Sequence, residues 1–90
     1  METSQEKLNQ AVALHQTGKI GEAAAIYRDI LTADPNNVMV IHLLCAVAMA
    51  YDNAQMVLNL SEQGIKIQPK FAILHQDRAT ALRRLPFKDT

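Results

Sequence analysis

The chain of 90 residues is predicted to be all-α, and three features of its sequence lead to this class. Its three glycines and three prolines are few enough to leave long segments without a helix-breaking residue. Apolar residues in these segments recur every three or four positions, as on one face of a helix. No segment alternates with a period of two over a useful length, so strands are not expected. The length suits one small domain.

The first two predicted helices have clear ends. Thr3 and Glu6 have the spacing of a capping box, which opens a helix, and Gly18 closes that helix. A second helix is predicted from Ile20 to Ala33, because the residue before Pro35 is excluded from the helical conformation. The apolar stripes comprise Leu8, Ala11, Val12 and Leu14 on the first helix, and Ala23, Ala24, Ile26, Tyr27, Ile30 and Leu31 on the second.

Three further helices are predicted. The third runs from a cap at Asn36 or Asn37 to about Tyr51, the fourth from about Ala54 to Ile67, and the fifth from Phe71 or Ala72 to Arg84. Pro69 and Pro86 end the fourth and fifth helices. The third helix is apolar nearly all round, which is expected of a helix with neighbours on both sides.

The helices recur at a fixed spacing. Pro35 and Pro69 lie 34 positions apart, and each follows the second helix of a predicted hairpin. A period of about 20–50 residues is the signature of stacked repeats. A shift of 34 aligns the small residues Ala11, Cys45 and Ala79, and the apolar residues Leu14, Ala48 and Leu82. We therefore predict a single domain at 1–90, with a first repeat at 3–36, a second at 37–70, a half repeat or capping helix at 71–85 and a tail at 86–90.

The sequence resembles that of tetratricopeptide repeat (TPR) proteins of the bacterial type, over about two and a half repeats of a 34-residue helix pair. In the first copy, the matching residues are Gly18, the pair Ala23 and Tyr27, and the DPNN stretch at 34–37. The sequence departs from the family pattern at Lys7 and Ser61, where the family has an aromatic residue, at Ile30, where it has a small one, and at Asp52 and Pro86, where it has glycine. The resemblance covers nearly the whole chain and is strongest in the first copy.

The resemblance implies a TPR-like α-α superhelix of antiparallel helix pairs, in which the first helix of each pair lines a concave groove. It also implies that a protein or peptide ligand binds in this groove. The residues expected to line the groove are Leu8, Val12, His15, Met39, His42, Ala46, Met49, Ile73, Gln76 and Arg83, with Gln5, Gln16, Thr80 and Arg84 on the same side. Methionine adapts its shape, which suits a flexible or helical partner. The alternative is that these side chains only pack beneath the next turn of the superhelix.

The resemblance excludes one kind of ligand. TPR domains that bind the acidic C-terminal peptides of chaperones use a clamp of two lysines, two asparagines and an arginine. The corresponding residues here are Leu8, Val12, Leu43, Ile73 and Asp77. None of these side chains can donate a charge-assisted hydrogen bond to a carboxylate. A chaperone tail is therefore not an expected ligand.

Charge and composition exclude other partners. Residues 64–90 contain six basic and two acidic side chains, but the basic ones lie at helical spacing without aromatic residues between them. We interpret them as a solvated helix face and expect no nucleic acid. The most apolar run, residues 38–51, is shorter than the ~20 residues that cross a bilayer, so no membrane insertion is expected. The polar N-terminus is unlike a leader peptide, which predicts a cytoplasmic protein.

No catalytic, cofactor or metal site is predicted. His42 and Cys45 lie one turn apart, a spacing that can ligate a metal, but a zinc site needs further ligands and the sequence has no second pair. Cys45 falls at a predicted helix crossing, so we interpret it as a packing residue. His75 is interpreted as a packing or capping side chain. No nucleophile has an assignable base, and no glycine-rich phosphate loop is present. We therefore do not expect an enzyme.

Three functions remain. The preferred hypothesis is a non-catalytic protein–protein interaction module, a scaffold or adaptor that binds a peptide or partner helix in its groove. The second is a self-associating structural unit, a possible homo-oligomer. The third, implied by resemblance to the leading repeats of bacterial TPR proteins, is the N-terminal interaction segment of a larger enzyme such as a glycosyltransferase or sulfotransferase.

Overall fold

The computed structural model describes residues 3–85, and the described chain forms five α-helices and no strand. The helices are α1 (Ser4–Gln16), α2 (Ile20–Ala33), α3 (Val38–Ala50), α4 (Ala54–Ile67) and α5 (Ala72–Arg84). The all-α class and the five predicted helices are confirmed, with bounds within one or two residues of those expected. The predicted tail at 86–90, including Pro86, lies outside the described residues.

The two predicted helix caps are confirmed, and a third that was not predicted opens α4. The Thr3 hydroxyl accepts a hydrogen bond from the Glu6 backbone N–H, and the Glu6 carboxylate accepts one from the Thr3 N–H. These two bonds form a complete capping box and lower the pKa of Glu6. Asn37 caps α3 through the Val40 N–H, and Asn53 caps α4 through the Met56 N–H.

The turn that closes each helical hairpin repeats 34 residues later. Gly18 and Asp52 both have left-handed backbones, with φ of 88° and 57°. The Gly18 and Lys19 N–H groups donate to the carbonyls of His15 and Leu14, and the N–H groups of Asp52 and Asn53 donate to the carbonyls 34 positions further on, those of Met49 and Ala48. Both turns are therefore Schellman motifs, although only the first has the glycine that this conformation favours.

The segments that lead from one hairpin to the next also repeat. Asp34 and Gln68, which end α2 and α4, have nearly identical torsion angles, with φ of −138° and −140° and ψ of 79° and 86°. The N–H groups of both residues donate to carbonyls four positions earlier, at Ile30 and Gly64. The periodicity read from the sequence is thus present in the backbone geometry of both kinds of turn.

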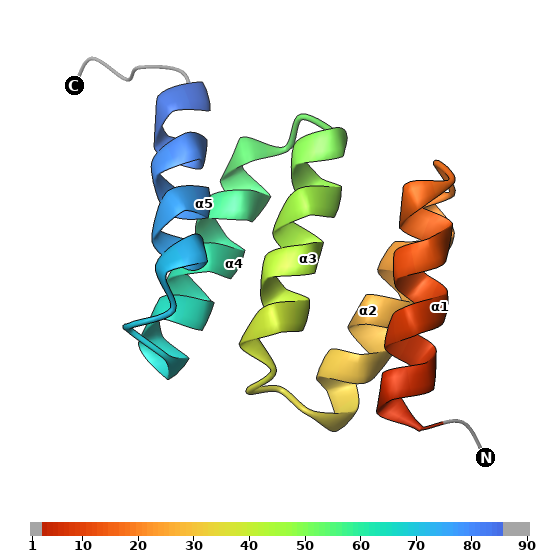
Figure 1. The fold of residues 1–90 in the computed structure, drawn as a ribbon. Helices are drawn as coiled ribbons and strands as arrows, with labels where there is room; N and C mark the ends of the chain where they lie inside the picture. Colours follow the sequence, from red (N-terminus) through yellow and green to blue (C-terminus); the bar gives the residue numbers. More distant parts are fainter. Residues whose placement is uncertain (1–2, 86–90) are drawn as a thin grey trace.

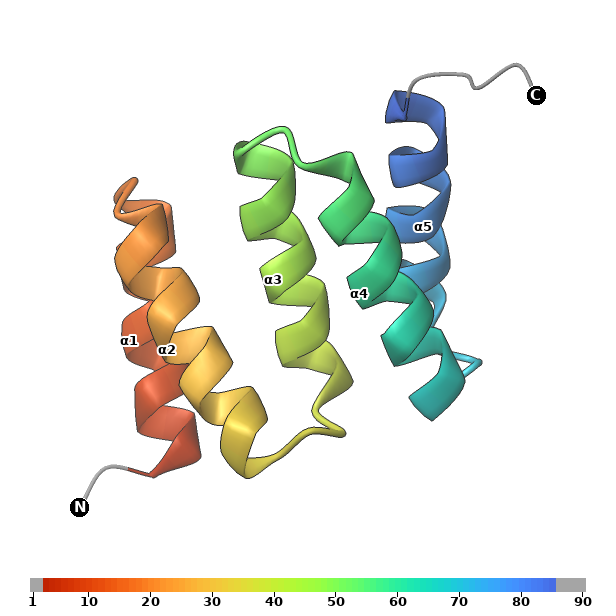
Figure 2. The same ribbon diagram turned by 180° about the vertical axis from the view of Figure 1, so that it is seen from behind.

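The helices lie side by side in a row, as Figures 1 and 2 show from opposite sides, and the structure measures 51 × 28 × 18 Å. In Figure 1, α1 lies in front of α2 and α5 in front of α4, and this order is reversed in Figure 2. Helix α2 packs against α1 and α3, and helix α4 packs against α3 and α5. The second helix of each hairpin therefore lies between two first helices.

The core follows this arrangement. One cluster of buried side chains joins α1, α2 and α3 and includes Ala11, Ala23 and Tyr27. A second cluster joins α3, α4 and α5 around Cys45, Ala48, Val57 and Ala81, and a third joins Val38 and Ile41 to Leu74. Small residues were expected at the helix crossings. Of these, Ala11, Ala23 and Cys45 are fully buried, whereas Ala79 is only half-buried because no described helix covers that side of α5.

The first helices of successive repeats, α1, α3 and α5, are not evenly spaced. Cα atoms of α3 and α5 approach within 8 Å, whereas no Cα of α1 lies this close to one of α3. Gly64 on α4 lets the Leu74 side chain of α5 approach closely, but the equivalent position on α2 is the buried Ile30. A wall formed by α1, α3 and α5 was expected to be regular, but α3 and α5 approach each other more closely than α1 and α3 do.

Candidate functional site

The predicted groove residues on α3 and α5 form one surface, which we call the α3–α5 surface. It consists of Met39, His42, Ala46 and Met49 on α3, and Ile73, Gln76, Asp77, Thr80 and Arg83 on α5. On α3 these residues recur every three or four positions, and on α5 they do so with Gln76 and Asp77 side by side, so the residues of each helix share a face. Met39 is the most exposed apolar residue of the set, at 46%, while Ala46, Met49 and Ile73 are half-buried.

A hydrogen bond joins the two halves of this surface. The Nδ1 atom of His42 lies 2.6 Å from Oδ2 of Asp77, and both side chains are about four-fifths buried, with 21% and 19% exposed. His42 was expected to line the groove, whereas Asp77 was considered only as the residue at one position of the clamp. The period of 34 aligns Asp77 with Leu43 and gave no sign that Asp77 meets His42. The pair places a carboxylate where a peptide-binding clamp would need a cation.

Cys45 lies one turn from His42 and is fully buried. Its thiol donates a weak hydrogen bond to the Val57 carbonyl, with a sulfur–oxygen distance of 3.9 Å. Burial raises the pKa of the Cys45 thiol to about 12, and the nearby Asp77 carboxylate adds to this effect. A thiol in this state is not a nucleophile near neutral pH, because the thiolate is the reactive form. The interpretation of Cys45 as a packing residue agrees with this environment.

The predicted groove residues of α1 are Leu8, Val12 and His15, all half-buried. Nδ1 of His15 lies 3.2 Å from the Tyr27 hydroxyl, within hydrogen-bonding distance, and the two rings are tilted with their centroids 6.0 Å apart. His15 thereby gives the buried Tyr27 hydroxyl a partner. These residues lie on the helix that does not approach α3, so the structure does not bring them into the α3–α5 surface.

The polar residues near the end of α5 have partners on the protein. Arg83 lies 3.4 Å from the Thr80 hydroxyl, and Arg84 forms an ion pair of 3.4 Å with Asp52 in the turn before α4. His75 lies with its Nε2 2.6 Å from the Pro69 carbonyl, in the turn before α5. His75 thus ties α5 to the turn before it, but it does not cap the helix, because no side chain caps the start of α5. Gln76 is exposed.

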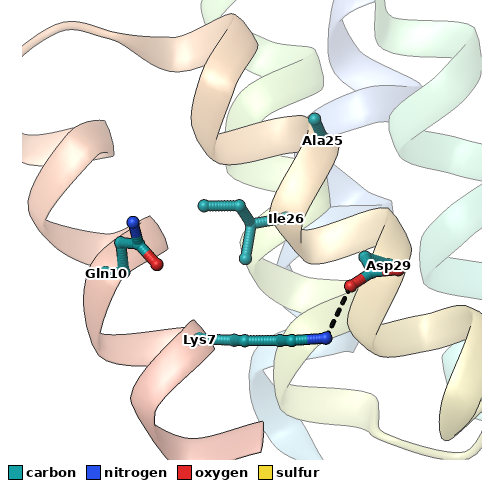
Figure 3. A pocket seen from close by; sticks show the side chains of 5 residues that line it. All are labelled: Lys7, Gln10, Ala25, Ile26 and Asp29. Atoms are coloured by element: carbon teal, nitrogen blue, oxygen red, sulfur yellow. Dashed lines mark hydrogen bonds and ion pairs between the residues drawn. The ribbon is translucent and has the colours of Figure 1, made fainter. Parts of the chain in front are cut away.

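A hollow that the sequence analysis did not predict lies between α1 and α2. It has a volume of ≈ 370 Å³, is open to solvent, and is lined by Lys7, Gln10, Ala25, Ile26 and Asp29 (Figure 3). The Lys7 ammonium and the Asp29 carboxylate form an ion pair of 2.8 Å across it. Lys7 is the residue that stands in place of the family's bulky aromatic. The signal for the hollow was therefore present in the sequence.

Two further features bear on the possible chemistry. Within residues 3–85, no group of three or more histidine, cysteine, aspartate or glutamate side chains is arranged to hold a metal ion. Among the same residues, no helix has the length and apolar character needed to span a bilayer.

Comparison with known proteins finds no matching family model and no matching curated protein. The TPR resemblance, and the function that it implies, therefore depend on the residues and the geometry described above.

Proposed function

We propose that the chain is a TPR-like, non-catalytic protein–protein interaction module, a scaffold or adaptor that binds a peptide or partner helix on its α3–α5 surface. The repeat of both turns at 34 residues supports a TPR-like arrangement of the hairpins. In this arrangement the first helix of each pair faces the ligand. The close approach of α3 and α5 makes their faces the part of the groove that is continuous.

The observation that carries the proposal is the contact between His42 and Asp77, because it joins the two helix faces into one surface. Met39 remains 46% exposed beside this pair, although its side chain is apolar. Partly buried apolar side chains with a few polar groups are typical of ligand-binding surfaces. Methionine also repacks easily around different partners.

The chemistry of the surface indicates which ligand it binds. The Asp77 side chain, which contacts His42, is a carboxylate, and a carboxylate does not attract the carboxylate of a peptide. The apolar contacts come from Met39, Met49 and Ile73, and Arg83 adds one cation at the edge. We therefore propose an amphipathic helix or an extended peptide with apolar anchor residues, rather than an acidic chain terminus.

The raised pKa of Cys45 supports the non-catalytic assignment, since this thiol is not available as a nucleophile. His42 and Asp77 bond to each other, and the contact of the Asp77 carboxylate with the Cys45 thiol raises the pKa of that thiol further and so keeps it protonated.

A peptide selection tests the proposal. Immobilised wild-type protein selects binders from a displayed library of random peptides about 16 residues long, which is about four turns when the peptide is helical. We expect enriched peptides that bind the wild type and lose at least tenfold in affinity for Met39→Lys. The matched control is Leu82→Lys, because Leu82 is 47% exposed and lies outside the α3–α5 surface. This control should bind the same peptides as the wild type.

Met39 is a better test position than Met49. Met49 is half-buried and packs against the cluster formed by Cys45, Ala48, Val57 and Ala81, so Met49→Glu would lower stability as well as remove a contact. The proposal fails if no peptide is enriched, or if the enriched peptides bind Met39→Lys as well as they bind the wild type.

A further inference from the structure

The His42 imidazole has one ring nitrogen bonded inside the protein and one open to solvent. Nδ1 lies 2.6 Å from Oδ2 of Asp77, and this is the only hydrogen bond of the His42 side chain within residues 3–85. Among the same residues, every buried side-chain nitrogen or oxygen atom has a hydrogen-bond partner. Since Nε2 has no partner, it must lie in the 21% of the side chain that remains exposed on the α3–α5 surface.

The contact with Asp77 decides which nitrogen of His42 carries the proton. A carboxylate can only accept a hydrogen bond, so Nδ1 must be the nitrogen that donates. In a neutral imidazole the other nitrogen is then an acceptor. Because both side chains are about four-fifths buried, the ring is held in one orientation. The surface therefore presents a fixed hydrogen-bond acceptor, the lone pair of Nε2.

The surroundings of this acceptor are apolar. Met39 and Ala46 lie one turn before and one turn after His42 on α3, and Ile73 lies one turn before Asp77 on α5. Helix α3 contains no lysine, arginine, aspartate or glutamate. The Asp77 carboxylate already bonds to His42 and Cys45. A charged ligand group that covered Nε2 would therefore lose its hydration without gaining a free opposite charge.

Two kinds of side chain match an acceptor in apolar surroundings. Tryptophan carries one donor, the indole N–H, on a large apolar ring, and tyrosine carries a hydroxyl on a smaller one. Phenylalanine has no donor and would cover Nε2 without bonding to it, which carries a free-energy cost. Serine and threonine have a donor but little apolar area to place against Met39 and Ile73.

We propose that the ligand of the α3–α5 surface is anchored by a tryptophan or tyrosine side chain, whose N–H or O–H donates to Nε2 of His42 while its ring packs on Met39 and Ile73. This inference rests on the proposed function and names the chemistry that the ligand must carry. Asp77 does not touch the ligand in this arrangement. It is a positioning residue, because it keeps the proton of His42 on Nδ1 and so leaves Nε2 free to accept.

The position of the proton is tested first, on the free protein. Long-range ¹H–¹⁵N correlation spectra at about pH 8, where an imidazole is ordinarily neutral, distinguish a protonated ring nitrogen from one with a lone pair. We expect the wild type to carry the proton on Nδ1. Asp77→Ala should move it to Nε2, the preferred site in free histidine. The matched control is Glu62→Ala, which removes a carboxylate bonded to Arg78 and not to His42, and should leave the wild-type spectrum of His42 unchanged.

A wild type with the proton on Nε2 overturns the proposal, because the surface would then offer a donor. An Asp77→Ala variant that keeps the proton on Nδ1 overturns the role given to Asp77. Circular dichroism checks that both variants retain the helical content of the wild type.

The ligand is tested with the peptides selected on the wild type, which should share a tryptophan or tyrosine at one position. Synthetic peptides carry benzothienylalanine in place of this tryptophan, which exchanges the N–H for sulfur at nearly the same shape, or phenylalanine in place of the tyrosine. We expect the affinity for the wild type to fall about 5- to 100-fold, the effect of losing a buried hydrogen bond. The change is made in the peptide, so the folding of the protein is not affected.

The outcomes separate this inference from the proposed function. Peptides that bind the wild type but not Met39→Lys, and that tolerate the replacement or share an anchor of another kind, overturn the inference and leave the proposed function standing. A charged anchor, such as arginine or glutamate, is one such result. If no peptide is enriched, the proposed function fails and this inference fails with it.

Discussion

Gly64 of α4 lies so close to Leu74 of α5 that a Cβ atom on Gly64 would stand 2.5 Å from the Leu74 Cδ1. The same added atom would lie 3.3 Å from Ile41 of α3. Both neighbouring side chains are fully buried, so neither has free space into which to move. The absence of a side chain at this position allows three helices to meet.

Gly64→Ala should therefore destabilise the fold by about 1–3 kcal/mol, although alanine is the better helix former. The matched control is Gly21→Ala in α2, where the added Cβ would make an ordinary contact of 3.5 Å with the Tyr51 hydroxyl. This control should be neutral or stabilising by about 0.5 kcal/mol. Urea unfolding of both variants measures the difference. Equal stabilities would contradict the close contact among α3, α4 and α5.

Asp52→Gly should stabilise the protein by about 0.5–1 kcal/mol, because Asp52 holds a left-handed backbone at φ 57° that glycine adopts without strain. Asp52→Ala should instead be destabilising, since alanine, unlike glycine, does not adopt the left-handed backbone without strain, and it lacks the polar side chain of aspartate. The Arg84 ion pair has little effect on this comparison because both side chains are largely exposed. Arg84→Ala measures that contribution separately. A destabilised Asp52→Gly variant would be evidence against the left-handed conformation.

The environment of Cys45 predicts loss of stability in alkali. The folded state raises the pKa of the Cys45 thiol from 9.0 to about 12, so above pH 9 the unfolded chain releases a proton that the folded chain keeps. Stability is therefore full below pH 9 and falls as the pH rises towards 12. Burial also raises the pKa of Tyr27, which acts in the same direction from about pH 10 upward. Chemical unfolding at a series of pH values, with Cys45→Ala for comparison, should show a smaller loss between pH 9 and 10 in the variant.

The same feature is visible in thiol chemistry. At neutral pH the shift of the Cys45 pKa from 9.0 to about 12 lowers the thiolate fraction roughly a thousandfold, since each pKa unit is a factor of ten. A disulfide reagent should thus react with the native protein far more slowly than with the protein in denaturant. Rapid reaction of the native protein would mean that the thiol is accessible, and it would reopen the question of a nucleophile.

The His42–Asp77 pair should couple the stability of α3 to that of α5. A double-mutant cycle with His42→Ala and Asp77→Ala should give a coupling free energy of about 1–2 kcal/mol, because the pair is about four-fifths buried. The control cycle uses the more exposed pair Arg78–Glu62, for which about 0.2–1 kcal/mol is expected. Similar coupling in both cycles would show that the inner pair does not hold the two helices together.

Most of the fold could be predicted from the sequence because its signals are local. Gly18, Pro35 and Pro69 fix helix ends through backbone sterics, and a period of 34 relates one hairpin to the next. Asp52 was harder to interpret, since its left-handed backbone is imposed by the Schellman hydrogen bonds and not by its own preference. Residues that act within one turn of the chain were therefore predictable.

The candidate site was only partly predictable, because it depends on distances between helices. The periodicity placed the α3 and α5 residues on one side, but it gave no means of showing that His42 meets Asp77. Nor did it show that Gly64 allows Leu74 of α5 to approach α4 closely. The volume of single side chains at equivalent positions decides these distances. The pattern of apolar and polar residues does not specify these distances.

The uneven spacing of the hairpins has a consequence for how the molecule opens. Helix α1 packs closely on α2 alone, so the first hairpin is joined to the other three helices through the packing of α2 on α3. The first hairpin should therefore separate from the other three helices as a cooperative unit, at a lower free energy than global unfolding. Amide hydrogens in the middle of α1 should then exchange with deuterium before those in the middle of α3. The difference between the two exchange rates would measure how strongly the first hairpin packs against the rest of the molecule.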